Sequence, residues 1–131
     1  MLQTTQTSNS DTIVSLPVPT SAPITLGIDI GSTTAKAVLI KNGRIVYHCY
    51  ERHFAQVRQK ALELVLRLCN LIGPHPVKIA ISGSAGLGLA KAAGLPFVQE
   101  VYATSEAVRA LAPDTSAVIE LGGEDAKIIF L

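Results

Sequence analysis

The stretch Ile28-Asp-Ile-Gly-Ser-Thr-Thr-Ala-Lys-Ala-Val-Leu-Ile40 decides the fold, because its pattern returns as Ile119-Glu-Leu-Gly-Gly-Glu-Asp-Ala-Lys-Ile-Ile-Phe-Leu131. In each copy an apolar strand with an acidic residue at the second position enters a Gly-containing turn. A Lys follows five positions after the first Gly, and a second apolar strand begins there. Self-similarity at this long spacing indicates a duplicated supersecondary unit rather than a short-period solenoid.

The turn in each copy suits a phosphate that is held through a metal ion. Glycines leave backbone N–H groups uncovered, Ser and Thr hydroxyls add donors, and a Lys supplies counter-charge. The neighbouring acid, Asp29 or Glu120, would repel a bare phosphate, so a cation such as Mg²⁺ is expected between them. One such turn alone would more often be an ordinary β-hairpin. Two copies with identical spacing favour a polyphosphate clamped from both sides.

Composition limits the possible function classes. The chain has 131 residues, of which 48% are hydrophobic and 16% charged, and its net charge is +1. This is one domain's worth of chain, with neither the charge nor the aromatic content expected of a nucleic-acid partner. No apolar run approaches the roughly 20 residues of a membrane-spanning helix. Residues 1–23 contain no Lys or Arg, so we expect a flexible leader rather than a signal peptide. Cys49 and Cys69 have no metal-ligand spacing, which predicts that both are buried, reduced thiols in a cytoplasmic protein.

The hydrophobic pattern predicts an α/β fold. Three antiparallel strands are expected first, the second and third joined by the strong hairpin signal Asn42-Gly43. A helix of period 3.6 should then begin near Val57 and end at Gly73. The expected elements are strands at 24–30, 35–41, 44–50, 78–81, 97–100 and 117–121, with shorter helices at 87–93 and 104–111. We therefore predict a flexible leader over 1–23, a first lobe over 24–113 with a mixed five-stranded sheet, and the opening hairpin of an incomplete second lobe over 114–131.

This arrangement resembles ribonuclease H and the actin, heat-shock-chaperone and sugar-kinase superfamily of two-lobed ATPases. Within that superfamily it is most similar to the activases, or component A, of 2-hydroxyacyl-CoA dehydratases and benzoyl-CoA reductases, in their long multidomain form. Four segments carry the resemblance, namely Leu26–Lys36, Ile81–Gly86, Phe97–Val101 and Val118–Lys127.

The resemblance implies an ATPase that drives low-potential electron transfer. Its members are homodimers that hold one 4Fe-4S cluster between subunits and pass an electron to an acyl-CoA dehydratase or reductase component. With ATP and Mg²⁺ as cofactors, Asp29 and Glu120 would lie on the metal side, although Glu120 stands where short members commonly have Asp. The resemblance places the phosphates against Gly31, Ser32, Thr33, Thr34 and Lys36, and the terminal phosphate against Gly122 and Gly123. Glu124 and Asp125 would orient the attacking water.

Several alternatives stay open at this point. The family's cluster cysteines, adenosine loop and most of its second lobe would lie beyond Leu131, and neither cysteine matches the cluster motif, so this chain alone is expected to be inactive. A sugar or N-acetylhexosamine kinase fragment is the runner-up, but residues 97–109 lack the catalytic Asp that it would need. A non-catalytic nucleotide-binding module is the third. The Ser82–Gly86 loop is either a third phosphate contact or a strand-to-helix connection that needs Gly. The histidines, at positions 48, 53 and 75, are expected to be solvated or capping.

Overall fold

The computed structural model of the protein describes residues 4–6, 12–14 and 23–131. Near the amino terminus, β1 (Thr4–Gln6) and β2 (Thr12–Val14) pair antiparallel, and β2 lies against the central sheet at β5. Of the leader expected over 1–23, residues 1–3, 7–11 and 15–22 lie outside the described residues.

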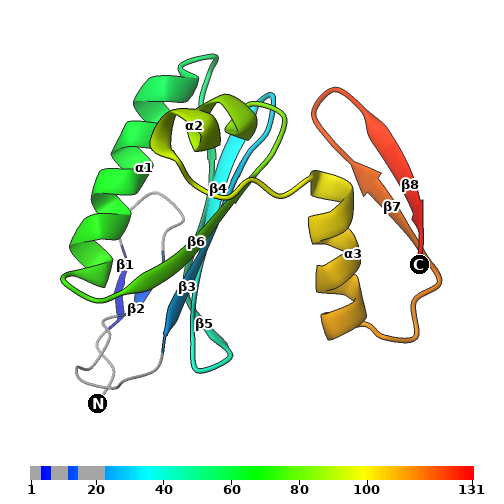
Figure 1. The fold of residues 1–131 in the computed structure, drawn as a ribbon, viewed down its shortest axis with the longest axis horizontal. Coiled ribbons are helices and arrows are strands. Elements are labelled where there is room, and N and C mark those ends of the chain that lie inside the picture. The colour runs from blue at the N-terminus through cyan, green and yellow to red at the C-terminus, as the bar shows by residue number, and fades with distance from the viewer. Residues whose placement is uncertain (1–3, 7–11, 15–22) are drawn as a thin grey trace.

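A mixed sheet of four strands forms the centre of the molecule, in the order β5-β4-β3-β6 (Figure 1). Its strands are β3 (Ile24–Ile30), β4 (Thr34–Lys41), β5 (Arg44–Arg52) and β6 (Val77–Ser82). β4 runs antiparallel to both of its neighbours, β3 and β5, whereas β6 pairs parallel with β3. Asn42 and Gly43 both have positive φ, at 53° and 71°, as a tight hairpin between β4 and β5 requires.

The fifth position of the sheet, beside β6, is occupied by a single parallel bridge between Ile81 and Phe97. The Val98 N–H donates to Ile81 O at 2.8 Å, and the Ile81 N–H donates to Pro96 O at 2.9 Å. The strand expected over 97–100 is therefore only one bridge long. It ends there because the next helix begins at Glu100.

One face of the sheet is covered by α1 (Val57–Ile72) and α2 (Gly86–Ala93), and the hydrophobic core lies between these helices and the sheet. β3 alternates buried and more exposed residues along its length. α1 buries Ala61, Leu64, Leu68 and Ile72, the three- and four-residue spacing of an amphipathic helix. Each fully buried Leu or Ile contributes about 1.5–3 kcal/mol to folding, so this layer dominates the stability of the sheet.

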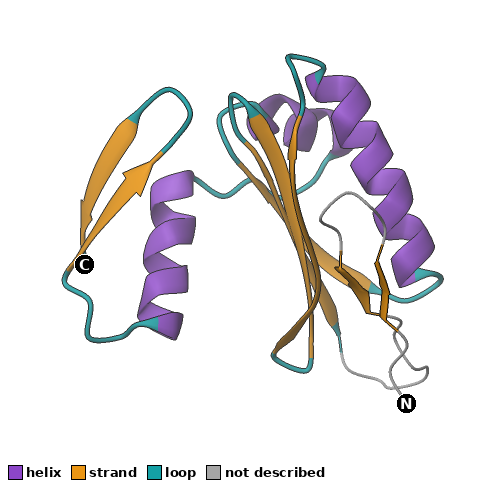
Figure 2. Ribbon diagram, turned by 180° about the vertical axis from the view of Figure 1, so that it is seen from behind, coloured by secondary structure: helices purple, strands orange, loops and turns teal. Residues whose placement is uncertain are grey.

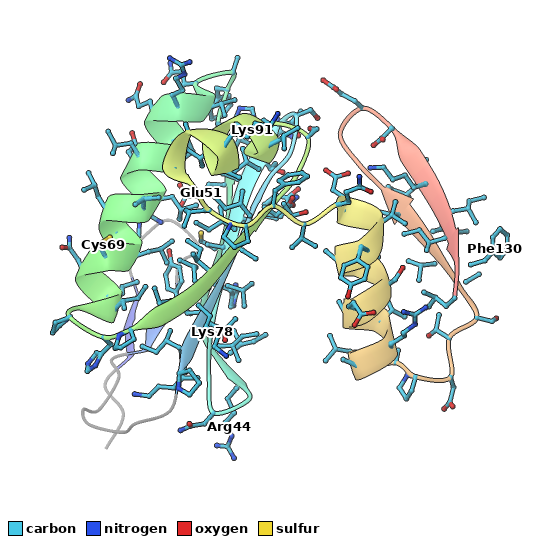
Figure 3. All side chains as sticks on the ribbon, in the orientation of Figure 1. Arg44, Glu51, Cys69, Lys78, Lys91 and Phe130 are labelled. Carbon is cyan, nitrogen blue, oxygen red and sulfur yellow. The ribbon has the colours of Figure 1, made fainter. Side chains whose placement is uncertain are left out.

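The opposite side of the sheet faces α3 (Glu100–Leu111), which is followed by a hairpin of β7 (Ala117–Leu121) and β8 (Ala126–Phe130) (Figure 2). α3 begins four residues before the expected start at Thr104. Most large apolar side chains of the hairpin are exposed, and Ile129 is its one buried residue. Figure 3 shows Phe130 pointing away from α3. None of the helices within the described ranges has the length and hydropathy needed to span a bilayer.

Candidate functional site

The two copies of the repeated pattern form two hairpins with matching cross-strand pairs. Asp29 lies opposite Lys36 in the β3–β4 register, and Glu120 lies opposite Lys127 in the β7–β8 register. An acid and a Lys therefore stand across from each other just before and just after each turn, as the sequence pattern indicates.

The ion pairs of the two hairpins differ. Lys36 Nζ lies 2.6 Å from Asp29 Oδ2, within its own hairpin. Lys127 Nζ instead lies 2.6 Å from Glu100 Oε2 on α3 and 3.1 Å from Asp125 Oδ2. The hydrogen bond with Glu100, and to a smaller extent the one with Asp125, raise the pKa of Lys127 above its ordinary value, so this side chain stays charged. The second hairpin is thus anchored to α3 through its lysine.

The turns of the two hairpins touch each other. A Cβ built on Gly123 would lie 2.7 Å from Thr33 Oγ1, so the absence of a side chain at this glycine permits the contact. Figure 1 shows both turns at the same end of the molecule. Between them lies a cavity of about 360 Å³. All the residues predicted for the site line this cavity, namely Asp29, Gly31, Ser32, Thr33, Thr34, Lys36, Glu120, Gly122, Gly123, Glu124 and Asp125.

The first turn offers free backbone donors to the cavity. The Gly31 N–H closes the hairpin by donating to Thr34 O at 2.9 Å. The N–H groups of Ser32 and Thr33 have no hydrogen-bond acceptor in the part of the chain that the structure describes. Converging backbone donors with adjacent hydroxyls are a common way to bind phosphate oxygens.

The charges around the cavity require a cation if a phosphate is to bind. Five carboxylates and two ammonium groups line it, so a bare polyphosphate would be repelled. Among residues 23–131 no group of three or more His, Cys, Asp or Glu side chains is gathered in a way that could hold a metal. An ion bound here would need the phosphates and water to complete its coordination, which is how Mg²⁺ is commonly held with one or two carboxylates.

Three lining residues were not among the predicted site residues: Ser84, Glu100 and Lys127. Lys127 was visible in the repeat as the counterpart of Lys36. Ser84 comes from the Ser82–Gly86 loop, where Gly83 has a φ of 95° and lies directly against the Ile30 carbonyl. Both expectations for that loop therefore have support, since it needs glycine for its geometry and also borders the cavity.

A larger groove of about 500 Å³ adjoins the cavity and shares Asp29, Lys36, Glu100 and Glu120 with it. It lies between the open face of the sheet and α3. The remaining lining is mostly apolar and small, including Gly27, Val38, Ala80, Ala103 and Ala107. This surface offers few hydrogen-bond partners for a ligand with many hydroxyls.

The two cysteines lie outside both cavities. Cys49 is buried in the core on β5, beside Tyr47. Cys69 is exposed on α1 (Figure 3), so the expectation of a buried thiol is wrong for this cysteine. A 4Fe-4S cluster takes four thiolate ligands. A cluster shared between two subunits would need both cysteines at one surface, and a buried Cys49 does not fit that requirement.

Comparison with known proteins identifies one family. The profile of the BadF/BadG/BcrA/BcrD ATPase family matches residues 26–131. The chain is 26% identical over 110 residues to the 2-hydroxyisocaproyl-CoA dehydratase activator of Clostridioides difficile, covering 82% of this chain and 41% of that protein. It is 27% identical over 105 residues to an uncharacterized protein of Methanocaldococcus jannaschii, covering 79% of this chain and 42% of that one. The chain thus spans about two fifths of the length of these relatives.

Two solved structures share the fold. Component A of (R)-2-hydroxyglutaryl-CoA dehydratase from Acidaminococcus fermentans matches with a TM-score of 0.69 at 22% identity, over 83% of this chain and 43% of that chain. The ethanolamine utilization protein EutJ of Carboxydothermus hydrogenoformans matches with a TM-score of 0.60 at 20% identity, over 87% and 48%. The predicted α/β, actin-like ATPase fold is confirmed.

Proposed function

The chain belongs to the BadF/BadG/BcrA/BcrD ATPase family, and from that premise we propose that it is the amino-terminal, phosphate-binding part of an ATP-hydrolysing activator. Its partner would be an acyl-CoA dehydratase or reductase component in the cytoplasm. The names of the similar activator and of the similar component A support this choice of partner. Because the chain spans only about two fifths of their length, the activity of the whole protein is part of the proposal.

The single observation that carries the proposal is the pair of hairpins that meet at one cavity, each with an acidic residue and a Lys in register. Asp29 and Glu120 would hold a Mg²⁺ ion from opposite hairpins. The ion would neutralise phosphate charge in the transition state. Lys36 and the free Ser32 N–H would bind the phosphates themselves.

The remaining roles follow from position around the same cavity. The second turn would contact the terminal phosphate through the backbone of Gly122 and Gly123. Glu124 and Asp125, in the same turn, would orient the attacking water. Thr33 and Thr34 would add hydroxyl donors from the first turn, which the contact between Gly123 and Thr33 brings close to the second.

The electron-transfer role that the resemblance implies finds no fitting ligands in the cysteines of this chain. Cys49 and Cys69 do not fit a shared 4Fe-4S cluster, because Cys49 is buried in the core and Cys69 is exposed on α1. A homodimer is proposed on the family resemblance alone. What these residues support is the binding of a magnesium–polyphosphate and the positioning of water for its hydrolysis.

A sugar-kinase role is less well supported. Its polyhydroxylated substrate would have to occupy the groove beside the phosphates, where Gly27, Val38 and Ala80 supply apolar surface rather than hydrogen-bond partners. A non-catalytic nucleotide-binding module remains compatible with the same cavity, because it would use the same phosphate contacts without turnover.

The test is an NMR titration of the 131-residue chain with ATP in the presence and absence of Mg²⁺. Since one lobe and one extra hairpin contact only phosphates, we expect a dissociation constant in the millimolar range or weaker, about 4 kcal/mol of binding. Asp29→Asn should remove the dependence on Mg²⁺. Asp114→Asn, which makes the same charge change at an exposed loop residue outside the cavity, should retain it.

Two results would contradict the proposal. Micromolar binding would show that a nucleotide is held by far more than the phosphate contacts described here. An Asp29→Asn chain that keeps the full response to Mg²⁺ would mean that the metal-side carboxylate is misassigned.

A further inference from the structure

His53 lies directly after β5 and against the turn of the first hairpin, residues 31–34, called the phosphate turn below. Its side chain is 2% exposed, so the expectation of a solvated histidine is wrong. It is not a helix cap either, because α1 has Gln56 at its N-cap and no side-chain capping hydrogen bond. Instead His53 Nε2 lies 3.0 Å from Gly31 O, and the His53 backbone N–H donates to Thr33 O at 3.2 Å.

These two contacts fix the orientation of the turn's peptide planes. A carbonyl oxygen only accepts, so His53 Nε2 carries the hydrogen. In a trans peptide the C=O of one residue and the N–H of the next point in opposite directions. With Gly31 O held toward the His53 ring, the Ser32 N–H points the other way. That side is the cavity, which Ser32 lines and His53 does not.

The local structure carries features that an ordinary core position would not retain. The other ring nitrogen, His53 Nδ1, is buried and has no hydrogen-bond partner among the described residues. The next two residues, Phe54 and Ala55, have positive φ values of 47° and 64°, which non-glycine residues adopt at an energetic cost. Unpaired buried polar atoms and strained backbone persist where a surrounding function requires them.

We propose that His53 is a positioning residue of the phosphate turn, whose ring holds the Gly31 carbonyl on the buried side so that the Ser32 N–H faces the phosphates. This inference rests on the proposed function for the identity of the ligand. The turn geometry itself can be measured without any ligand, so the two ideas can fail separately.

The experiment compares His53→Gln and His53→Leu in the full 131-residue chain. The Gln amide can donate from nearly the position of Nε2, whereas Leu fills the space without a donor. His48→Leu is the matched control, because His48 lies on β5, the strand that His53 follows, but is exposed.

In the ligand-free protein, a long-range proton–nitrogen NMR spectrum should show His53 protonated at Nε2. The amide resonances of residues 31–34 should shift and their hydrogen exchange should accelerate in His53→Leu, and much less in His53→Gln. In a titration with Mg·ATP, His53→Leu should bind about fivefold more weakly, as expected for the loss of one oriented hydrogen bond. His53→Gln and His48→Leu should bind within about twofold of the parent.

Each other result overturns the inference. Protonation at Nδ1 alone, unchanged turn amides in a folded His53→Leu chain, or a Gln variant as impaired as the Leu variant would each do so. If His53→Leu does not fold, the tautomer and the His53→Gln comparison decide. A parent chain whose amide resonances do not respond to Mg·ATP even at the highest soluble concentration would refute the proposed function, while the ligand-free spectra would still decide the role of His53.

Discussion

Gly83→Ala is predicted to be the most destabilising glycine substitution in the described part of the chain. The φ of Gly83 is 95°, and a Cβ there would lie 2.2 Å from Ile30 O and 2.4 Å from Ile30 C. Both are backbone atoms, so no side-chain rotation relieves the clash, and the loop must move away from β3. That movement also breaks the hydrogen bond from the Ala85 N–H to Ile30 O, which is 3.0 Å long.

The expected size of the effect follows from these terms. The left-handed backbone costs an alanine about 1–2 kcal/mol, and loss of a buried backbone hydrogen bond costs about 1–3 kcal/mol. We therefore expect the free energy of unfolding to fall by roughly 3 kcal/mol, a large part of the 5–15 kcal/mol typical of a domain. The same movement would carry Ser84 away from the cavity.

Two other glycines supply matched controls for urea denaturation followed by circular dichroism. Gly43 has a φ of 71°, and a Cβ there would meet open space. Gly43→Ala should therefore lose only the cost of placing an alanine in this left-handed conformation, about 1 kcal/mol of unfolding free energy. Gly88→Ala is exposed in α2 with nothing within 4 Å, and it should gain about 0.5–1 kcal/mol from helix propensity. A Gly83→Ala chain no less stable than Gly43→Ala would refute the close packing of the loop on β3.

Two further predictions concern the ion pair between Arg67 and Glu51 and the second hairpin. The hydrogen bond from Arg67 is the main reason why the pKa of Glu51 lies below its ordinary value of 4.5. The ionised carboxylate therefore stabilises the fold at pH values above 4.5, and this stabilisation is lost as the pH falls through the lowered pKa. Glu51→Gln should lower the unfolding free energy by about 1 kcal/mol at neutral pH, and its denaturation curve should converge with that of the parent in acid. Because Ile119 and Phe130 are 69% and 81% exposed, the full chain should self-associate with rising concentration, and deletion of residues 117–131 should give a monomer that keeps the first sheet. Light scattering over a concentration series would contradict this if the full chain stayed monomeric throughout.

The elements that the sequence predicted best are those with a strong local signal. The two hairpins were found because an acid, a glycine and a lysine recur at fixed spacing. The helix from Val57 was found because its apolar residues follow the helical period over several turns. Asn42-Gly43 predicted its hairpin because few residues tolerate positive φ at both turn positions.

The region from Phe97 to Thr104 was harder to predict for a physical reason. The apolar run Leu95-Pro96-Phe97-Val98 reads as a strand, but only Phe97 finds a partner, because the chain then turns away from β6. Gln99 has an extended conformation with φ −66° and ψ 142°, and the helix begins with Glu100 in its first turn, where an acidic side chain is favoured by the helix dipole. A local pattern cannot show where a sheet edge stops accepting hydrogen bonds.

The same distinction applies to the candidate site. Residues within the repeated pattern were predicted and line the cavity, although their chemical roles stay a prediction. Glu100 was missed because its importance comes from Lys127, which lies far along the chain and reaches it only after the second hairpin packs on α3. His53 was missed because its partner, Gly31, is 22 positions away and its side chain has no motif around it.

The ion pair between Asp29 and Lys36 has a thermodynamic consequence for any ligand of this cavity. On the proposed function, Asp29 must turn to the magnesium ion and Lys36 to the phosphate, so that each side chain exchanges its present counter-ion for a new one. Binding of either component alone would leave one member of the pair without an opposite charge. Metal and nucleotide should therefore bind with positive coupling, and by linkage each should raise the affinity for the other by the same factor.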